Sequence, residues 1–188
     1  AKLENGQILE GEDEIDIPLR NPFLKIKKVW LEPKGKINPE AEKAILEADI
    51  ITIGPGDLYS TLVPSLLMKG MPETIKKSKA KKVYICNAMT KLGETINFTV
   101  SDFIEAIEKY LGKNILDFAL YNQRIPSRER ILEYQKDTPF VFDCVKFNRQ
   151  KLSKIKKPKV IGVDLLTSPA GPILHEPYVL AKIILSLV

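Results

Sequence analysis

Histidine and cysteine are scarce in this sequence, whose 188 residues include one histidine and two cysteines. Cys86 and Cys144 lie far apart, with no CxxC spacing and no histidine cluster near them. This excludes a disulfide scaffold and a zinc site of the usual spacing, and we expect two buried free thiols. The single histidine, His175, excludes most multi-histidine metal sites. A Ser-His-Asp triad would need it as the base, and nothing else in the sequence supports such a triad.

Long apolar runs are also lacking. No run approaches the roughly 20 residues that span a bilayer, and the first residues, AKLENGQILEGEDE, show no basic-then-apolar signal pattern. We therefore expect a cytoplasmic protein with no membrane partner. The length and the 44% share of hydrophobic residues fit one ordinary globular domain.

Arginine is scarce as well, and aromatic residues make up only 7% of the chain. The net charge of +5 comes largely from lysine, in runs such as the block KLSKIKKPK at 151–159. No aromatic residues interleave this block, so base stacking has little support and we expect no nucleic-acid partner. Lysines at helix C-termini offset the helix dipole and keep surfaces soluble, which explains these runs without a ligand.

The rest of the chain alternates between strand and helix patterns. Apolar residues flank Asn5-Gly6, which predicts an N-terminal β-hairpin, and the acidic segment 11–16 is expected to lead into a proline-containing loop. The predicted strands are 24–31, 50–53, 83–86, 115–121, 139–143 and 159–166, and the predicted helices are 39–49, 72–79, 101–112, 127–136 and 178–188. This order predicts an α/β fold with a Rossmann-like parallel sheet that carries helices on both faces.

The segment 101–112 is predicted to be a helix with one apolar face. Ser101 can cap its start and Gly112 can close its end. The residues that share the apolar face are Phe103, Ile104, Ile107, Tyr110 and Leu111.

Functional residues are expected in the loops that follow the strands, because ligands of open α/β sheets bind beyond the carboxyl ends of the strands. The three loops are GPGDLYST at 54–61, NAMTKLGET at 87–95 and NQRIPS at 122–127. In the first, two glycines allow a close backbone approach, and free amides with the hydroxyls of Ser60 and Thr61 suit a phosphate or another anion. A tight turn capped by Asp57 explains this loop equally well, and Asp57 would repel a phosphate placed against it.

The second loop gathers hydrogen-bonding groups around Gly93, directly after a buried strand. Its Glu94 could be a general base, an acceptor for sugar hydroxyls or a loop-stabilising acid, and the sequence does not choose among them. We expect this loop and the first one to face a common cleft at one edge of the sheet.

Four stretches together resemble the gluconeogenesis factor family of CofD-like proteins. They are GPGDLYSTLVPSLL, KVYICNAMTKLGET, IPSRERILEYQ and ILHEPYVLA. The resemblance implies a cytoplasmic regulatory protein that binds a UDP-sugar, such as UDP-N-acetylglucosamine, and affects growth and cell shape on gluconeogenic carbon sources. Two alternatives stay open: a transferase similar to 2-phospho-L-lactate transferase, and a protein-interaction module without a small ligand.

The resemblance also implies a set of ligand-binding residues. Tyr134 falls where the family has a tyrosine implicated in holding the UDP-sugar, and Leu174-His175-Glu176 stands where the family usually reads Arg-His-Asp. The chain therefore lacks an arginine that would pair with the diphosphate. The expected ligand-binding residues are Gly54, Pro55, Gly56, Asp57, Tyr59, Ser60, Thr61, Asn87, Thr90, Glu94, Thr95, Tyr134 and His175.

We expect a single CofD-like α/β domain over residues 1–188, from which the N-terminal nucleotide-binding strands of the family are absent. The chain is then the C-terminal part of a longer family member or a natural short form. A sheet without those strands would expose an edge to a second copy or a partner chain, so a homo-oligomer is one expectation. No cofactor is expected for a regulatory protein. A divalent metal would enter only with transferase activity, and Asp57 and Glu94 alone would not hold it.

Overall fold

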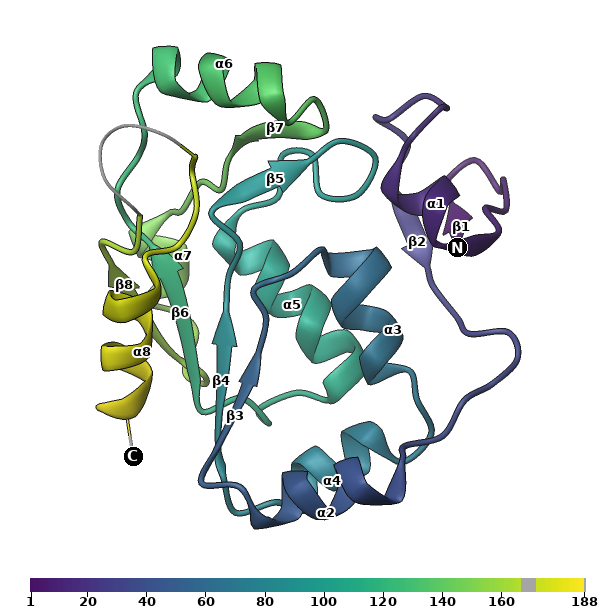
Figure 1. Ribbon diagram of the computed structural model, residues 1–188, viewed down its shortest axis with the longest axis vertical. Coiled ribbons are helices and arrows are strands. Elements are labelled where there is room, and N and C mark those ends of the chain that lie inside the picture. Colours follow the sequence, from purple (N-terminus) through teal and green to yellow (C-terminus); the bar gives the residue numbers. More distant parts are fainter. Residues whose placement is uncertain (167–171, 188) are drawn as a thin grey trace.

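A four-stranded parallel sheet forms the centre of the molecule (Figure 1). The computed structural model describes residues 1–166 and 172–187. The strands lie in the order β3-β4-β6-β8. Their bounds are Ile50–Ile53 for β3, Lys81–Ile85 for β4, Phe118–Asn122 for β6 and Lys159–Val163 for β8. The predicted α/β class with a Rossmann-like parallel sheet is confirmed.

The register of the sheet brings the carboxyl ends of its strands to one edge. Ile53 lies opposite Tyr84 of β4, and Val83 lies opposite Phe118 of β6. In β4, residues Val83, Tyr84 and Ile85 are at most 2% exposed, which explains why this strand is apolar without alternation. The loops after β3 and β4 therefore begin side by side.

Helices cover both faces of the sheet, as predicted (Figure 1). On one face, α3 and α5 contribute to the main core, and on the other, α8 packs on a smaller cluster around Val83, Leu120 and Leu165. The helices are α1 (Gly11–Asp16), α2 (Pro39–Glu47), α3 (Val63–Leu66), α4 (Met71–Lys77), α5 (Val100–Leu111), α6 (Arg128–Asp137), α7 (Arg149–Leu152) and α8 (Pro177–Leu185), with a π-helical turn at Leu58–Leu62 before α3. Val188, the last residue of the predicted terminal helix, lies outside the described residues.

The helix predicted at 101–112 is α5, with a different N-terminal cap. Thr99 is its N-cap in place of Ser101, in a capping box in which the Asp102 carboxylate accepts a hydrogen bond from the Thr99 backbone N–H at 2.7 Å. Gly112 closes the helix with φ of +111°, as predicted. Four of the five residues expected on the apolar face are buried, and Tyr110 is partly buried.

The N-terminal region forms a small antiparallel unit. Strand β1 (Lys2–Leu3) pairs with β2 (Ile26–Lys28), and the bridge between Lys2 and Ile8 closes the predicted hairpin around Asn5-Gly6. Strand β2 is shorter than the predicted 24–31. The acidic segment 11–16, for which no helix was predicted, forms α1, whose carboxylates in the first turn interact favourably with the helix dipole.

Strand β7 (Val141–Cys144) lies outside the central sheet, although the alternation predicted it as one more strand of that series. It pairs antiparallel with β5 (Met89–Lys91), a strand inside the loop that follows β4. Thr90 fixes this pairing, because its hydroxyl contacts both the backbone O and the backbone N–H of Asp143, at 3.0 and 3.1 Å. Both cysteines are free and buried, as predicted.

Within the ranges 1–166 and 172–187, the helices are too short or too polar to cross a bilayer.

Asp117, directly before β6, contacts residues near the starts of β4 and β8. Its carboxylate accepts a hydrogen bond from the Lys82 N–H at 3.0 Å and pairs with Lys157 Nζ at 3.1 Å. Burial alone would raise the pKa of Asp117, but these two partners lower it below the usual 3.8.

We expect Asp117→Asn to lower the free energy of unfolding by about 1 kcal/mol at pH 7, since a charge-assisted hydrogen bond and an ion pair are weakened. Because the folded-state pKa is depressed, this contribution is present above the unfolded-state pKa and is lost as pH falls through the folded-state pKa. Urea unfolding at pH 7 and pH 3 measures it. A difference between the two proteins that stays the same at both pH values would contradict the assignment.

Candidate functional site

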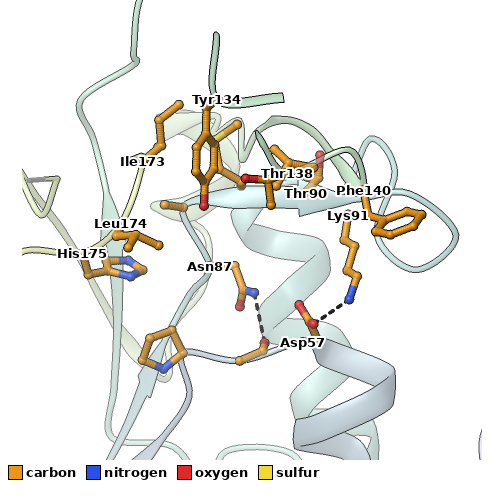
Figure 2. A pocket seen from close by; sticks show the side chains of 15 residues that line it. Asp57, Asn87, Thr90, Lys91, Tyr134, Thr138, Phe140, Ile173, Leu174 and His175 are labelled. Atoms are coloured by element: carbon orange, nitrogen blue, oxygen red, sulfur yellow. Dashed lines mark hydrogen bonds and ion pairs between the residues drawn. The ribbon is translucent and has the colours of Figure 1, made fainter. Parts of the chain in front are cut away.

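A cavity of about 380 Å³ opens at the carboxyl ends of β3 and β4 (Figure 2). The loop after β3 and the segment from Asn87 through β5 form one part of its wall. Helix α6, the turn before β7 and the segment before α8 form the rest. The lining residues are Pro55, Gly56, Asp57, Asn87, Ala88, Met89, Thr90, Lys91, Tyr134, Thr138, Phe140, Val141, Ile173, Leu174 and His175.

The two strand-end loops meet at the floor of this cavity. Asn87 Nδ2 donates a hydrogen bond to the backbone O of Gly56 at 3.0 Å (Figure 2). Gly54 takes φ of +81°, and a Cβ placed there would lie 2.8 Å from the backbone O of Ile85. Glycine is therefore required at this turn, because the loop passes directly against the end of β4.

Behind the cavity, Glu94 joins the same two loops through a buried network. Its carboxylate accepts hydrogen bonds from the backbone N–H groups of Tyr59 at 2.7 Å and Ser60 at 3.3 Å, and from the Ser60 hydroxyl at 3.0 Å. The Glu94 side chain is fully buried. Burial raises its pKa, and the charge of Asp57 adds to this effect, while the Tyr59 N–H and Lys91 offset part of it. Of the three roles left open for Glu94, this geometry matches the loop-stabilising acid.

Lys91 stands between three carboxylates of this network. Its Nζ lies 2.7 Å from Asp57 Oδ2 and 3.7 Å from Glu94 Oε1, and it also contacts Asp16 Oδ1. Burial alone would lower the pKa of Lys91, but the hydrogen bonds to Asp16 and Asp57 raise it overall. The side chain is therefore a fixed cation at the edge of the cavity.

Asp16 brings the N-terminal segment into the site. It lies at the end of α1 and accepts a hydrogen bond from the Ser60 hydroxyl at 3.1 Å. Arg20 Nη2, a few residues later, donates to the backbone O of Gly93 at 2.9 Å. The N-terminal segment thus covers the second loop from outside the sheet.

The thirteen expected residues fall into three groups. Those that line the cavity are Pro55, Gly56, Asp57, Asn87, Thr90, Tyr134 and His175. Those buried behind it are Tyr59, Ser60, Glu94 and Thr95, of which Thr95 accepts a hydrogen bond from the Lys91 N–H at 2.9 Å. The remaining two are Gly54, at the turn, and Thr61, which is exposed on the π-helical turn.

Sequence reasoning missed several residues of the site. Asp16 could not be predicted, because nothing in the sequence places the acidic segment 11–16 over the two loops. Lys91 was not among the expected site residues. A signal for Lys91 existed, since it is the one lysine in the loop 87–95 that directly follows a buried strand. The aromatic and apolar wall residues Phe140 and Ile173 had no distinguishing signal.

The residue after His175 caps α8: the Glu176 carboxylate accepts a hydrogen bond from the Val179 N–H at 2.6 Å.

A divalent metal does not fit the acidic cluster as it stands. Asp16, Asp57 and Glu94 each offer one oxygen, and the three atoms lie within 4.8 Å of one another, which is a ligand set suited to a hard cation. However, Lys91 Nζ contacts the same carboxylates. Its ammonium group takes the position that a cation would need.

Together, the fold and the cavity define an α/β protein of the Rossmann-like class whose candidate site lies at the carboxyl ends of parallel strands. The sequence model of the family described as "2-phospho-L-lactate transferase CofD" matches residues 1–164, and the chain belongs to this family.

Known relatives cover the whole chain. It is 34% identical to the gluconeogenesis factor of Bacillus subtilis over 191 residues, which are 100% of this chain and 57% of that protein. It is 46% identical to the gluconeogenesis factor of Halalkalibacterium halodurans over 118 residues, covering 62% of this chain and 35% of that protein. A crystal structure from Bacillus halodurans superposes with a TM-score of 0.86 at 35% identity, over 98% of this chain and 57% of the other. The matched part thus makes up between about a third and little more than half of the length of these relatives.

Proposed function

We propose that this chain is the CofD-like part of a gluconeogenesis factor, a cytoplasmic regulatory protein that binds a UDP-sugar in the cavity above β3 and β4. The names of its relatives support the first statement. The protein would respond to the nucleotide sugar and affect growth and cell shape on gluconeogenic carbon sources, and we propose regulation rather than catalysis.

The composition of the cavity wall carries this proposal. Tyr134 and Phe140 bring aromatic rings to the wall, Met89 and Ile173 pack in one apolar cluster with Tyr134, and Asn87 and His175 add polar groups (Figure 2). An apolar wall with a few polar groups is the usual make-up of a small-molecule site. A planar uracil or the face of a sugar ring would fit against the ring of Tyr134.

Calorimetric titration of UDP-N-acetylglucosamine into this chain, and in parallel into the full-length product of its gene, tests the proposal. We expect saturable heat with a stoichiometry near one site per chain. No heat from either protein at millimolar ligand would overturn it.

Tyr134→Ala should weaken UDP-N-acetylglucosamine binding by about tenfold, because stacking on an aromatic ring contributes about 1 to 3 kcal/mol. Tyr178→Ala is the matched control: this tyrosine is 85% exposed on α8 and does not line the cavity. Calorimetry of both variants, with thermal unfolding to confirm that each is folded, gives the comparison. Equal affinities of the two variants would show that the ring of Tyr134 does not contact the ligand.

A further inference from the structure

Two buried polar atoms in the cavity wall lack hydrogen-bond partners among the residues that the structure describes. They are Asn87 Oδ1 and His175 Nε2. Asn87 uses its other polar atom, Nδ2, to hold the Gly56 carbonyl, so its amide cannot be flipped without losing that bond. In Figure 2, His175 lies on the opposite side of Asn87 from Lys91. A buried polar atom without a partner destabilises the fold, so two in one wall require a physical reason.

Both atoms can accept a hydrogen bond. Burial lowers the pKa of His175, against the smaller opposing effect of the Cys86 backbone carbonyl, so the ring is neutral at pH 7 and one of its nitrogens keeps a lone pair. In the Nδ1–H tautomer that nitrogen is Nε2, which makes it an acceptor. The Asn87 carbonyl oxygen is an acceptor by its nature.

A phosphate group does not suit this part of the wall. A diphosphate is itself an acceptor and needs donors or cations. Lys91 is the only lysine or arginine among the described residues that line the cavity, and Asp57 and Asp16 already pair with it. Asp57 also lines the cavity with a carboxylate. The unpaired acceptors therefore require a neutral group that donates hydrogen bonds.

We infer that hydroxyl groups of a bound sugar, and not its diphosphate, bind to Asn87 Oδ1 and His175 Nε2. A rotation of either side chain toward the cavity would let its acceptor receive a hydrogen bond from a hydroxyl, and that bond would satisfy an atom that is otherwise buried without a partner among the described residues. This inference rests on the proposed UDP-sugar function and names the part of that ligand that the cavity recognises. Sugar hydroxyls occur in both the hexose and the ribose, so the test separates the two.

The test uses two substitutions of the single histidine. In His175→Asn, the side-chain NH₂ can replace Nδ1–H against the Cys86 carbonyl, but nothing replaces the Nε2 acceptor. In His175→Gln, the longer amide can place its oxygen near the former position of Nε2. We expect His175→Asn to bind UDP-N-acetylglucosamine about tenfold more weakly than the unsubstituted protein. This change corresponds to about 1.4 kcal/mol, which is the contribution of one hydrogen bond. His175→Gln should lose less affinity, because its amide oxygen can accept in place of Nε2.

Calorimetry with UDP-N-acetylglucosamine and with UDP alone then locates the hydroxyls. If His175→Asn weakens the binding of UDP-N-acetylglucosamine but not that of UDP, the hydroxyls belong to the hexose. If it weakens the binding of both ligands equally, they belong to the ribose. If His175→Asn binds both ligands as the unsubstituted protein does, the inference is wrong while the proposed function stands. If the unsubstituted protein binds neither ligand, both fail together.

Imidazole ¹⁵N NMR gives a second measurement that needs no ligand. The chain has one histidine, so the spectrum contains one imidazole spin system. We expect the Nδ1–H tautomer at pH 7. Observation of the Nε2–H tautomer would overturn the inference, because Nε2 would then be a donor.

Discussion

Lys91→Met is expected to lower the free energy of unfolding by about 3 kcal/mol, since removing one partner of a buried ion pair leaves an uncompensated charge. The Lys91 side chain is 17% exposed and Glu94 is fully buried. Asp16 and Asp57 are about a third exposed, which keeps the expected loss at the lower end of the range for buried pairs. Without the ammonium group, three carboxylates would repel one another at the junction of α1 and the two loops.

The loss should depend on pH with a definite sign. Lys91 and the Ser60 hydroxyl lower the pKa of Asp16 although burial alone would raise it. A depressed carboxylate pKa stabilises the fold above the unfolded-state pKa, and that contribution disappears as pH falls through the folded-state pKa. The difference in stability between the two proteins should therefore be largest near neutral pH and should shrink below about pH 4.

Lys146→Met is the matched control for this change. Lys146 pairs with Asp143 at 2.9 Å, but its side chain is 68% exposed, so we expect a loss of at most about 1 kcal/mol. Urea unfolding of both variants between pH 3 and pH 8 makes the comparison. Equal losses in the two variants would show that Lys91 is no more than a surface cation.

Gly54→Ala is the second large effect that we expect, also about 3 kcal/mol of unfolding free energy. A residue with a Cβ at positive φ costs about 1 to 2 kcal/mol. The new Cβ would also lie 2.8 Å from the Ile85 carbonyl oxygen, a backbone atom at the end of β4 that cannot rotate away. Because this turn sets the position of Gly56 against Asn87, ligand affinity should fall as well.

Gly6→Ala separates the two contributions. Gly6 has φ of +91°, close to that of Gly54, but no atom lies within 4 Å of the place where its Cβ would be. We expect only the conformational cost at Gly6, about 1 kcal/mol, and the excess at Gly54 then measures the contact with Ile85. Thermal and urea unfolding supply both values. An equal loss at the two glycines would rule out a close approach of the loop to β4.

The central sheet could be predicted from the sequence because its strands are short apolar runs, of which β4 and the middle of β6 are buried on both faces. The strand at 50–53 was predicted with its observed bounds, and helix α5 was predicted to within a residue, since its apolar spacing and Gly112 are local signals. The errors came where pairing is not local. The segment 139–143 was recognised as a strand, but its partner in β5 is about fifty residues earlier in the chain, and a strand pattern does not name its partner.

The candidate site shows the same division. The two loops after β3 and β4 could be located from glycine, asparagine and the ends of apolar runs, because parallel strands bring their carboxyl ends to one edge. The sequence could not divide the loop residues between the cavity and the network behind it. Asn87 and Glu94 belong to one loop, yet one lines the cavity and the other is buried against Tyr59.

By itself, the sequence determined the α/β class, the position of the strand ends and the family, since these depend on periodicity, turn residues and local motifs. Only the tertiary structure decided what the polar residues do. It placed Asp16 against Lys91, although 75 positions separate them, and it left Asn87 Oδ1 and His175 Nε2 without partners among the described residues. Hydrogen bonds and charges depend on distances of a few ångströms between residues remote in sequence, and the packing of the whole chain sets those distances.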